Sequence, residues 1–540
     1  MTQSFNLVEQ PWIPVVVAGR RQEVSLAQAL LEAQQIDGLA MEQPLETAAV
    51  LRQVLLPVLL HSCGAPRDQQ EWAARFGAGQ VDVARVSDYL AEHRAQFDLA
   101  DPVRPFAQVA GLTAGTGQTK PLAVLVAALP AGNNVPLYGA QYVSPPPAFS
   151  AAQAARAVLA AHCWDSAGLK TGAVGDPQAR AGKTSGNRTG SLGALGVVIP
   201  VGRGLFATLL LNSPILPQGL HPADRPQWTV EHDPTWSERP AGGLLDLLTW
   251  QSRRIRLIGD QTGSYAQVVV CAGDRLAVLD PVMEPHTAWR QVDKPAAGGP
   301  PVRPVRHRVG RAAWQGMVSL LALRPVSAGP SITTTMMVRQ LAEQRASRLV
   351  PADLRLQVLT VGLLYGTQSA VVEDQVSDLI PLPVTALLDN SSVRGLVLRL
   401  AEQADALRLA ANTLQDNVAE AAGAGERMPW DKGQHLGQTL IGLLDPDVRR
   451  LLAGLQRNPD MVDEADWAWR ENARRHALGL IDPLVTAAPP RAFLGRPAEL
   501  GGRRHMNLTT ALNRYQWAVR DILGDPEPAP DQLTAIGATP

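Results

Sequence analysis

The segment Ser391–Ala422, with the sequence SSVRGLVLRLAEQADALRLAANTLQDNVAEAA, decides the C-terminal part of the fold. Most of its apolar residues recur at intervals of three or four, which is the spacing of one face of an α-helix. Pro381 and Pro383 stand before it and interrupt the preceding chain. The pattern predicts one long amphipathic helix, whose apolar face is formed by Val393, Leu396, Leu400, Leu407, Ala410, Leu414 and Val418.

Three further helical patterns follow this segment, at residues 434–455, 463–485 and 507–523. Four amphipathic helices with short connections are most simply a bundle, which we place at residues 386–523. The second helix is expected to be interrupted at Pro446, because proline lacks an amide proton and crowds the preceding turn. Residues 524–540 are rich in proline and aspartate and are expected to form a flexible tail.

Residues 1–385 have a mixed character. β-like runs such as Trp12–Val17 and Ala266–Val270 alternate with helical stretches such as Leu45–His61, and glycine and proline separate them. The regular βαβ alternation of a doubly wound fold is absent. The sequence therefore predicts an α+β fold, in which a large mixed N-terminal domain (residues 1–385) precedes a C-terminal four-helix bundle.

The composition excludes several classes of protein. The chain has 540 residues, of which 46% are hydrophobic and 18% are charged, and no apolar run is long enough to cross a bilayer. The first five residues lack the basic start and the apolar core of a secretory signal. We therefore expect a soluble cytoplasmic protein that has no membrane partner.

The sequence gives no support to metal, cofactor or catalytic chemistry. Cys63, Cys163 and Cys271 are far apart, and no His/Cys cluster has the spacing of metal ligands. There is neither an HExxH motif nor a nucleophile elbow. Paired acids such as Asp445 and Asp447 stand where helices turn, which is typical of capping. We expect no catalytic residue, no cofactor and no enzymatic activity.

The net charge of −1, from 49 basic and 50 acidic residues, excludes a global cationic field. The charge is unevenly distributed, however. Residues 301–350 contain 8 basic residues and 1 acidic residue, whereas residues 351–540 contain 18 and 24. Four arginines of the basic block are expected on a Pro/Gly-rich loop that either contacts phosphate or is an ordinary solvated loop: Arg303, Arg306, Arg308 and Arg311.

A glycine-rich segment is similar to the end of a phosphate-binding loop at Gly182-Lys183-Thr184. A Walker A loop needs a glycine five positions before Gly182, but Pro177 stands there and has no amide. Nucleotide binding is therefore disfavoured. The whole segment Gly168–Gly196 contains eight glycines among four cations. The backbone of this segment either contacts phosphate or the edge of a nucleic-acid groove, or the segment is a disordered surface loop.

Seven segments, in order along the chain, resemble one protein family. They are Phe5–Val15 (FNLVEQPWIPV), Gly168–Pro177 (GLKTGAVGDP), Leu209–Asn212 (LLLN), Asp224–Trp228 (DRPQW), Thr249–Leu257 (TWQSRRIRL), Glu284–Arg290 (EPHTAWR) and Tyr365–Ser369 (YGTQS). In these segments the chain is similar to the large subunit of the type I-E CRISPR Cascade complex, the CasA family. The resemblance covers residues 5–378, and beyond them it rests on the bundle architecture alone.

The resemblance implies a non-catalytic subunit of an RNA-guided antiviral complex. In that family the large subunit recognises the protospacer-adjacent motif in double-stranded DNA, initiates strand separation for R-loop formation and recruits a helicase-nuclease effector. The implied partners are double-stranded target DNA, the guide RNA 5′ handle, the other Cascade subunits and that effector. In such systems the protein recognises a short DNA motif, and base pairing with the guide RNA recognises the rest of the target sequence.

The family places a glutamine wedge on a hairpin tip, where it inserts under the motif and props the duplex open. Gln368 matches that glutamine, and Thr367 and Gly366 shape the implied tip. The alternative is an ordinary polar turn.

The family's glycine-rich loop presents its backbone to the minor groove. It falls near Gly182, Lys183 and Gly186, in a register that is open by a residue or two. A basic minor-groove contact of the family maps loosely near Arg275, which otherwise is a surface turn residue.

The family's first loop docks on the complex near the guide's 5′ handle. It resembles the segment Asn133–Gly139, and the implied contacts are Asn134, Leu137 and Tyr138. Tyr138 is either an aromatic anchor or a core residue of a short strand. Some relatives carry cysteine pairs consistent with a zinc site near this loop, and this chain has no such pairs, which again predicts no metal.

Two functions from other classes stay open. The first is a P-loop-like nucleotide-binding enzyme, for which nucleotide binding should be saturable and lost in Lys183→Ala. The second is a non-selective nucleic-acid-binding scaffold, which should bind duplexes with different flanking trinucleotides equally at fixed salt.

Overall fold

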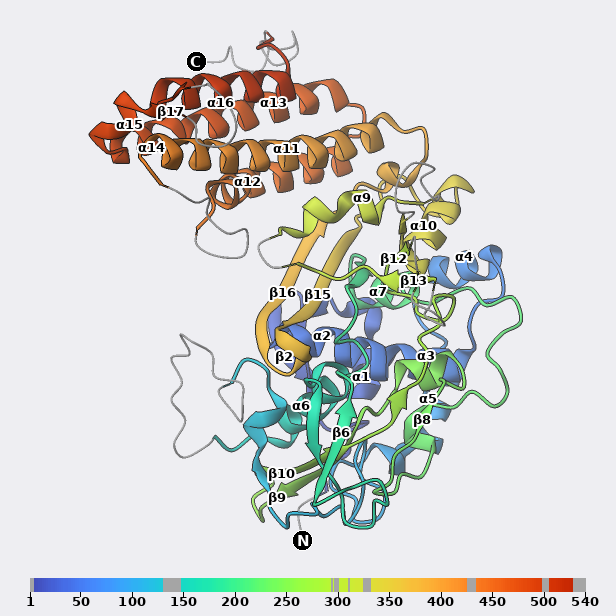
Figure 1. Ribbon diagram of the computed structural model, residues 1–540. Coiled ribbons are helices and arrows are strands. Elements are labelled where there is room, and N and C mark those ends of the chain that lie inside the picture. Colours follow the sequence, from blue (N-terminus) through green and yellow to red (C-terminus); the bar gives the residue numbers. More distant parts are fainter. Residues whose placement is uncertain are drawn as a thin grey trace. The chain divides into compact units, whose positions relative to one another are not determined.

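The computed structural model divides into two compact units (Figure 1). The N-terminal unit contains residues 1–309 and 322–379, and the C-terminal unit contains residues 310–321 and 380–540. The α+β class predicted from the sequence is confirmed. The structure describes residues 4–129, 147–292, 295, 301–308, 311–323, 332–424, 434–497 and 505–527.

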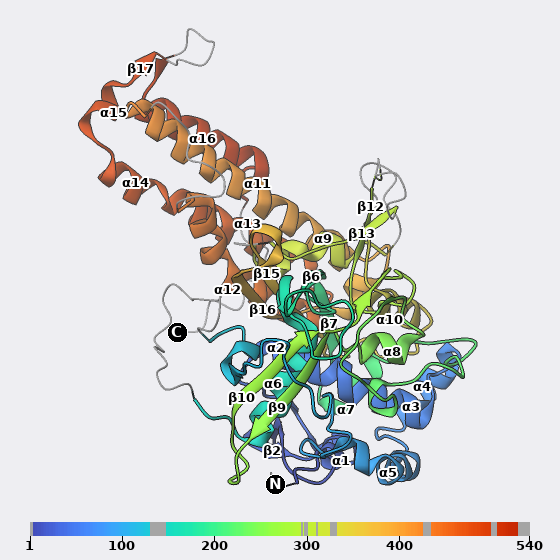
Figure 2. The same ribbon diagram turned by 60° about the horizontal axis from the view of Figure 1, so that its bottom comes forward.

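Four long helices pack side by side in the C-terminal unit (Figures 1 and 2). They are α11 (Ser392–Ala421), α12 (Leu436–Arg457), α13 (Val462–Gly479) and α16 (Leu508–Leu523). The apolar face predicted for α11 is buried, except that Ala411 rather than Ala410 faces the bundle. Trp469 of α13 is fully buried and its indole donates to Gln403 at 2.8 Å, so this tryptophan serves packing. Burial of these apolar faces stabilises the bundle.

Pro446 does not interrupt the second helix, and the prediction of a break there is wrong. Helix α12 continues through Pro446. Gly442, whose carbonyl lacks a donor because of the proline, lies with Pro446 on the exposed side, where water reaches the carbonyl. Leu444 and Val448 are fully buried on the other side. Packing therefore holds the helix together across the proline.

The third helical pattern is two helices instead of one. Helix α13 ends at Gly479, and α14 (Ile481–Ala487) begins after Leu480. Pro483 lies in the first turn of α14, where a helix needs no amide donor, whereas in a continuous helix it would crowd the carbonyl of Gly479. A short helix, α15 (Pro490–Leu494), follows.

A buried helix, α6 (Ala151–Trp164), lies in the core of the N-terminal unit. All its residues except Gln153 are buried, and its many alanines allow close packing on α2 (Pro44–Val50). The chain continues from α2 through a π-helical turn into α3 (Leu56–Cys63), which agrees with the predicted helical stretch. The unit's other helices are α1 (Leu26–Leu31), α4 (Gln69–Gly77), α5 (Val83–Glu92), α7 (Leu205–Leu211), α8 (Leu244–Leu248) and α10 (Met336–Ala346).

The strands of the N-terminal unit form several small sheets (Figure 2). Three of these have the orders β2-β1-β3, β4-β10-β9 and β16-β15-β7, and β5 pairs with β6. Their bounds are β1 (Ile13–Val17), β2 (Arg20–Val24), β3 (Gly38–Leu39), β4 (Lys120–Pro121), β5 (Gly168–Thr171), β6 (Lys183–Asn187), β7 (Val197–Val201), β9 (Arg253–Gly259), β10 (Tyr265–Ala272), β15 (Gln357–Tyr365) and β16 (Val372–Pro381). Two further sheets have the orders β11-β8 and β13-β12-β14, with bounds β8 (Glu238–Arg239), β11 (Arg275–Leu276), β12 (Trp289–Gln291), β13 (Val302–Pro304) and β14 (Ile332–Thr333).

A buried ion pair joins distant parts of the N-terminal unit. Arg52 donates to both carboxylate oxygens of Glu284, at 2.7 and 2.9 Å, and to Nδ1 of His286 at 2.7 Å. Burial and the charge of Arg52 lower the pKa of His286 well below its usual value, so the ring is neutral. Its Nε2 then donates to Asn212 at 2.9 Å. Two of the segments that resemble the CasA family therefore meet in the core.

Within the described residues, no helix is long and apolar enough to span a membrane. The same part of the chain contains no group of three or more His, Cys, Asp or Glu side chains that could hold a metal ion.

Replacing Pro446 with alanine should stabilise the bundle. The Pro446→Ala variant regains the amide that donates to the carbonyl of Gly442, and we expect its free energy of unfolding to rise by ~1–3 kcal/mol. Leu444→Ala, on the buried side of the same turn, should lower it by ~2–5 kcal/mol. Urea unfolding followed by circular dichroism measures both changes. A lower midpoint for Pro446→Ala would show that the proline ring itself contributes to packing.

Candidate nucleic-acid interface

The hairpin of β15 and β16 ends in a tip with an uncommon backbone conformation (Figure 1). Gln368 and Ser369 have φ angles of 57° and 55°, a region that residues other than glycine rarely occupy. Gly366 allows Glu373 to approach, because a Cβ at residue 366 would lie 2.3 Å from that side chain. Thr367 and Gln368 are exposed. The tip therefore presents the candidate glutamine from a constrained turn.

The tip is bound to the start of β5. The amide of Ala167 donates to the carbonyl of Ser369 at 2.8 Å. A Cβ at Gly168 would lie 3.9 Å from the side chain of Ala370, which is ordinary van der Waals contact. The candidate wedge and the glycine-rich segment therefore adjoin directly.

The glycine-rich segment forms a second hairpin, in which β5 pairs with β6. For these residues the alternative of a disordered loop is wrong. The amide of Gly172 donates to the carbonyl of Gly182 at 2.9 Å and closes the base of the intervening loop. Gly182 and Gly186 have φ angles of 69° and 71°, which favour glycine. Lys183 and Gly186 are exposed, so these candidate residues lie on an accessible strand.

The geometry of this hairpin disfavours nucleotide binding. A P-loop places its Lys-Thr pair at the N-terminus of a helix, where amides surround phosphate, but Lys183 and Thr184 begin the strand β6. Thr184 is also buried, so its hydroxyl does not face a solvent-filled site.

Arg275, the loosely mapped basic residue, lies against β6. Its Nη2 donates to the carbonyl of Ser185, and its guanidinium lies 3.8 Å from the centre of the Trp236 ring. A Cβ at Gly186 would lie 3.3 Å from Nη1 of Arg275, so glycine leaves room for the arginine. The structure thus brings the candidate arginine and one candidate glycine together.

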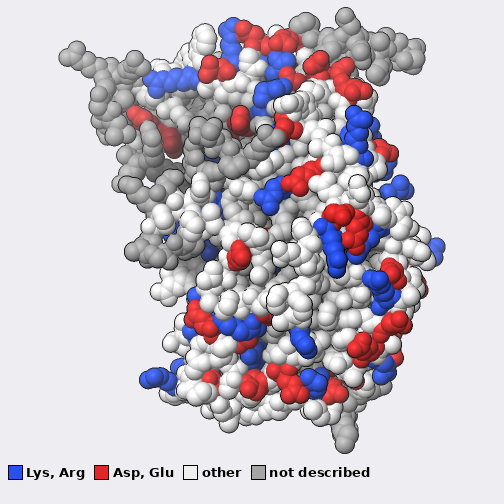
Figure 3. Space-filling model, turned by 90° about the vertical axis from the view of Figure 1, so that its right-hand side faces the viewer, with Lys and Arg blue, Asp and Glu red and all other residues white. Residues whose placement is uncertain are grey.

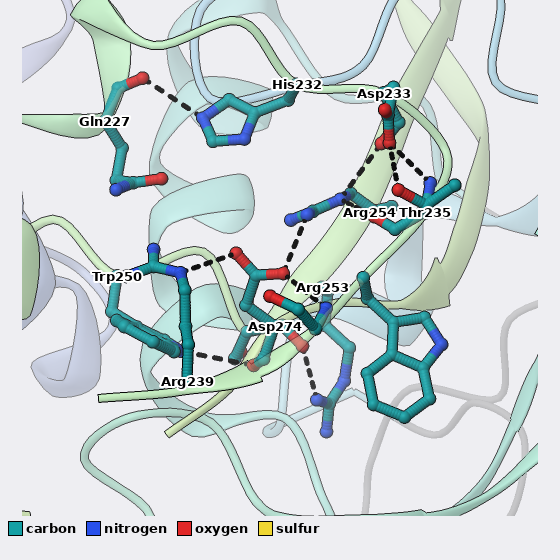
Figure 4. A network of polar contacts seen from close by, with 12 residues as sticks. Gln227, His232, Asp233, Thr235, Arg239, Trp250, Arg253, Arg254 and Asp274 are labelled. Atoms are coloured by element: carbon teal, nitrogen blue, oxygen red, sulfur yellow. Dashed lines mark hydrogen bonds and ion pairs between the residues drawn. The ribbon is translucent and has the colours of Figure 1, made fainter. Parts of the chain in front are cut away.

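A buried polar network holds the backbone beside Arg275 (Figure 4). Arg254 donates to one carboxylate oxygen of Asp274 at 2.9 Å, and Nε of Arg239 lies 3.5 Å from the other. The guanidinium of Arg239 lies 4.2 Å from the centre of the Trp250 ring, whose indole donates to the carbonyl of Asp274 at 3.1 Å. Because Asp274 directly precedes Arg275, the network fixes the position from which Arg275 extends.

Arg253 connects β9 to both ends of the glycine-rich hairpin. Its side chain is 2% exposed and forms an ion pair with Asp165. It also donates to the carbonyls of Ser166 and Arg188, at 2.8 Å each, just before β5 and just after β6. Burial would raise the pKa of Asp165, but the charges and hydrogen bonds of Arg253 and Lys170 outweigh it and lower the pKa to about 2. The charged carboxylate therefore persists at neutral pH.

Comparison with known proteins identifies the family. Residues 6–480 match the family model of the CRISPR-associated protein Cse1. The chain belongs to the Cse1 family. This confirms the resemblance to the CasA family that the sequence segments indicated.

Individual Cse1 proteins are similar to different lengths of this chain. The chain is 32% identical over 271 residues to the CRISPR-associated protein CasA/Cse1 of Thermus thermophilus, and the match covers 48% of this chain and 50% of that relative. Thermobifida fusca Cse1 is 30% identical with a TM-score of 0.83, covering 96% of this chain and 98% of that structure. A chain of a CRISPR RNA-guided surveillance complex has the same fold, with a TM-score of 0.68 at 18% identity, covering 96% and 99%.

In this Cse1 chain, two of the four arginines predicted to contact phosphate are exposed without an ion pair among the described residues, and the other two have partners. Arg303 lies in β13, so the segment predicted as a loop is partly a strand. Arg303 and Arg308 are exposed and form no ion pair within the described residues. On the face shown in Figure 3, basic side chains are interspersed with acidic ones.

The other two arginines of that set have partners. Nε of Arg306 donates to the carbonyl of Ala194 at 2.9 Å. Arg311 belongs to the C-terminal unit and lies 3.0 Å from Asp405 of α11. Their guanidinium groups are therefore less available to phosphate than those of Arg303 and Arg308.

The predicted complex-docking residues Asn134, Leu137 and Tyr138 lie outside the described residues, so their role stays a prediction. Sequence reasoning missed Trp236 and Asp274, and it gave Arg253 only as part of a Cse1-like segment. The available signal was the run Arg253-Arg254-Ile255-Arg256-Leu257-Ile258, in which three arginines share a strand with apolar residues. Asp165 lies 88 residues away, and no local pattern predicts such a pairing.

Removing the half-buried carboxylate that pairs with the buried Arg253 should destabilise the N-terminal unit more than removing an exposed one. We expect Asp165→Asn to lower the free energy of unfolding by ~3 kcal/mol at pH 7, because it leaves Arg253 buried without its counter-ion. Glu238→Gln, which breaks the exposed pair with Arg188, should cost less than about 1 kcal/mol. Urea unfolding of the three proteins provides the comparison.

The effect of Asp165→Asn should also depend on pH. The pKa of this carboxyl is lower in the folded chain than in the unfolded chain, so its contribution is complete above about pH 4 and declines as pH falls towards 2. The stability gap between the wild-type chain and Asp165→Asn should narrow over that range. A gap that stays constant would contradict the ion-pair assignment.

Proposed function

We propose that this protein is the non-catalytic large subunit of an RNA-guided antiviral surveillance complex. In this proposal it recognises a protospacer-adjacent motif in double-stranded DNA, initiates strand separation for R-loop formation and recruits a helicase-nuclease effector. Membership of the Cse1 family supports the class, and the fold shared with a chain of a CRISPR RNA-guided surveillance complex agrees with it. The proposal places the protein in the cytoplasm, together with target DNA, the guide RNA 5′ handle and the other Cascade subunits.

The observation that carries the proposal is the direct hydrogen bond between Ala167 and Ser369. Opening the first base pairs costs a few kcal/mol of unstacking. A wedge offsets part of that cost only if its position is fixed relative to the surface that holds the duplex. The bond places the tip that presents Gln368 next to the start of the glycine-rich hairpin.

That hairpin suits reading of the minor groove. Glycine exposes backbone amides and carbonyls without a side chain, and Gly186 does so beside the guanidinium of Arg275. Lys183 adds a cation on the same strand, and Gly182 directly precedes it. The minor groove carries a degenerate pattern of donors and acceptors, so we expect a permissive set of motifs.

Removing the wedge side chain tests the proposal. In the assembled complex, Gln368→Ala should slow R-loop formation at least tenfold, while the composition of the purified complex stays unchanged; a tenfold change corresponds to about 1.4 kcal/mol of opening free energy. Stopped-flow fluorescence of a labelled duplex that carries the motif measures the rate. A normal opening rate in Gln368→Ala would refute the wedge assignment.

A matched control separates the tip from general surface effects. Gln80 is also an exposed glutamine of the N-terminal unit, outside both hairpins, and Gln80→Ala should open the duplex at the wild-type rate. Equal affinity of the wild-type complex for duplexes with and without the motif, at fixed salt, would instead favour a non-selective scaffold.

The first loop supplies a separate test of assembly. Tyr138→Ala should weaken docking of this subunit on the guide-RNA complex, because an aromatic anchor contributes a large share of an interface's free energy. Co-purification with the remaining subunits, quantified by band intensity, measures the loss. Unchanged co-purification would count against the anchor role.

A further inference from the structure

The N-terminal unit contains a cavity of about 490 Å³ beside the hairpin tip. Its walls are mostly apolar and come from the start of α2, from α6, from the segment that follows β4, from residues 165–170 and from the hairpin tip. The apolar lining includes Leu45, Val124, Leu125, Ala157, Ala160 and Trp164. Its volume lies within the roughly 300–1,000 Å³ of sites that hold small organic groups. Gln368 of the tip also lines this cavity.

An exposed leucine stands at the edge of the cavity. Leu169 is 68% exposed although it lies in the strand β5, and it lines the same cavity as Gln368. Val371, on the tip itself, is also an exposed large hydrophobic residue. Scattered single apolar side chains on a surface need no explanation, but here two of them flank the candidate wedge. A flat, apolar partner would cover them.

The polar groups of the cavity suit a base and its phosphate. Gln43 and Gln368 provide amide donors and acceptors. Lys120 is exposed and forms no ion pair within the described part of the chain, so its ammonium is available to a phosphate. Lys170, by contrast, is engaged by Asp165 at 2.8 Å. Two carboxylates, Glu46 and Asp165, also line the cavity, and both are ion-paired, Glu46 with Arg156 and Asp165 with Lys170 and Arg253. The site thus combines apolar walls, two amides, two ion-paired carboxylates and one available cation.

We propose that this cavity receives one unpaired nucleobase of the opened duplex, with Leu169 packing on the face of the base and Lys120 near its phosphate. The inference rests on the proposed function, because strand separation at Gln368 produces the unpaired base. An extruded base loses its stacking partners, and an apolar pocket replaces part of that lost contact. The cavity would therefore retain the opened state after the wedge has entered.

A double-mutant cycle between protein and DNA tests the cavity. The assembled complex contains either the wild-type subunit or Leu169→Ala. Each complex is mixed with three duplexes that carry the motif: an intact duplex, and two duplexes that lack the first base after the motif in one strand or in the other. On the intact duplex, Leu169→Ala should slow opening about tenfold, in line with the stacking contribution of one base. On the duplex that lacks the bound base, Leu169→Ala should have no effect.

Controls distinguish failure of the cavity from failure of the proposed function. Val103→Ala, another exposed apolar side chain of the same unit, should change neither rate. If Leu169→Ala has no effect, or slows intact and both abasic duplexes equally, the cavity proposal is overturned. If in addition Gln368→Ala still slows opening, the proposed function survives that result. If Gln368→Ala opens the duplex normally, the proposed function fails as well.

Discussion

The candidate interface depends on one buried charge, the guanidinium of Arg253. Its donors are shared between the carboxylate of Asp165 and the carbonyls of Ser166 and Arg188, which flank the glycine-rich hairpin. A buried guanidinium that loses its acceptors costs on the order of 3–5 kcal/mol. A side chain from the neighbouring strand β9 therefore holds the two ends of the hairpin together. A glycine-rich sequence has little conformational preference of its own, and this anchor supplies its position.

Contacts from other segments also fix the positions of the residues beside the hairpin. Arg254, the next residue in β9, holds Asp274 and so fixes the backbone before Arg275. Ser369 accepts the amide of Ala167 and so fixes the hairpin tip against the start of β5. The hairpin tip, the glycine-rich hairpin and Arg275 thus occupy defined positions beside one another, and buried or backbone contacts hold them there. The exposed side chains remain free to meet a ligand.

Local sequence patterns predicted most of the long helices. The candidate interface was predicted only from the resemblance to the CasA family. The period of apolar residues gave α11 almost to its ends, because amphipathicity is a property of neighbouring residues. Pro446 was misjudged, since packing across the helix outweighed a local penalty. Arg253 lies inside the core, and its partner Asp165 is 88 residues away in the sequence. Pairing at such a separation has no local signature, so Trp236 and Asp274 were missed for the same reason.

The basic block at residues 301–350 does not give the whole chain a cationic field, because acidic residues elsewhere balance its charge. Arg253 and Arg254 are neutralised inside the core, while Lys183, Arg303 and Arg308 stay exposed. The salt-dependent part of DNA affinity scales with the number of phosphates neutralised, so under the proposed function we expect the few exposed cations of the candidate interface to give the free subunit a modest affinity for DNA. Strong charge-driven binding would hold the protein at any sequence. In the proposed function, a surface with few cations instead dissociates quickly from DNA that lacks the motif, and guide pairing supplies the affinity where the motif is present.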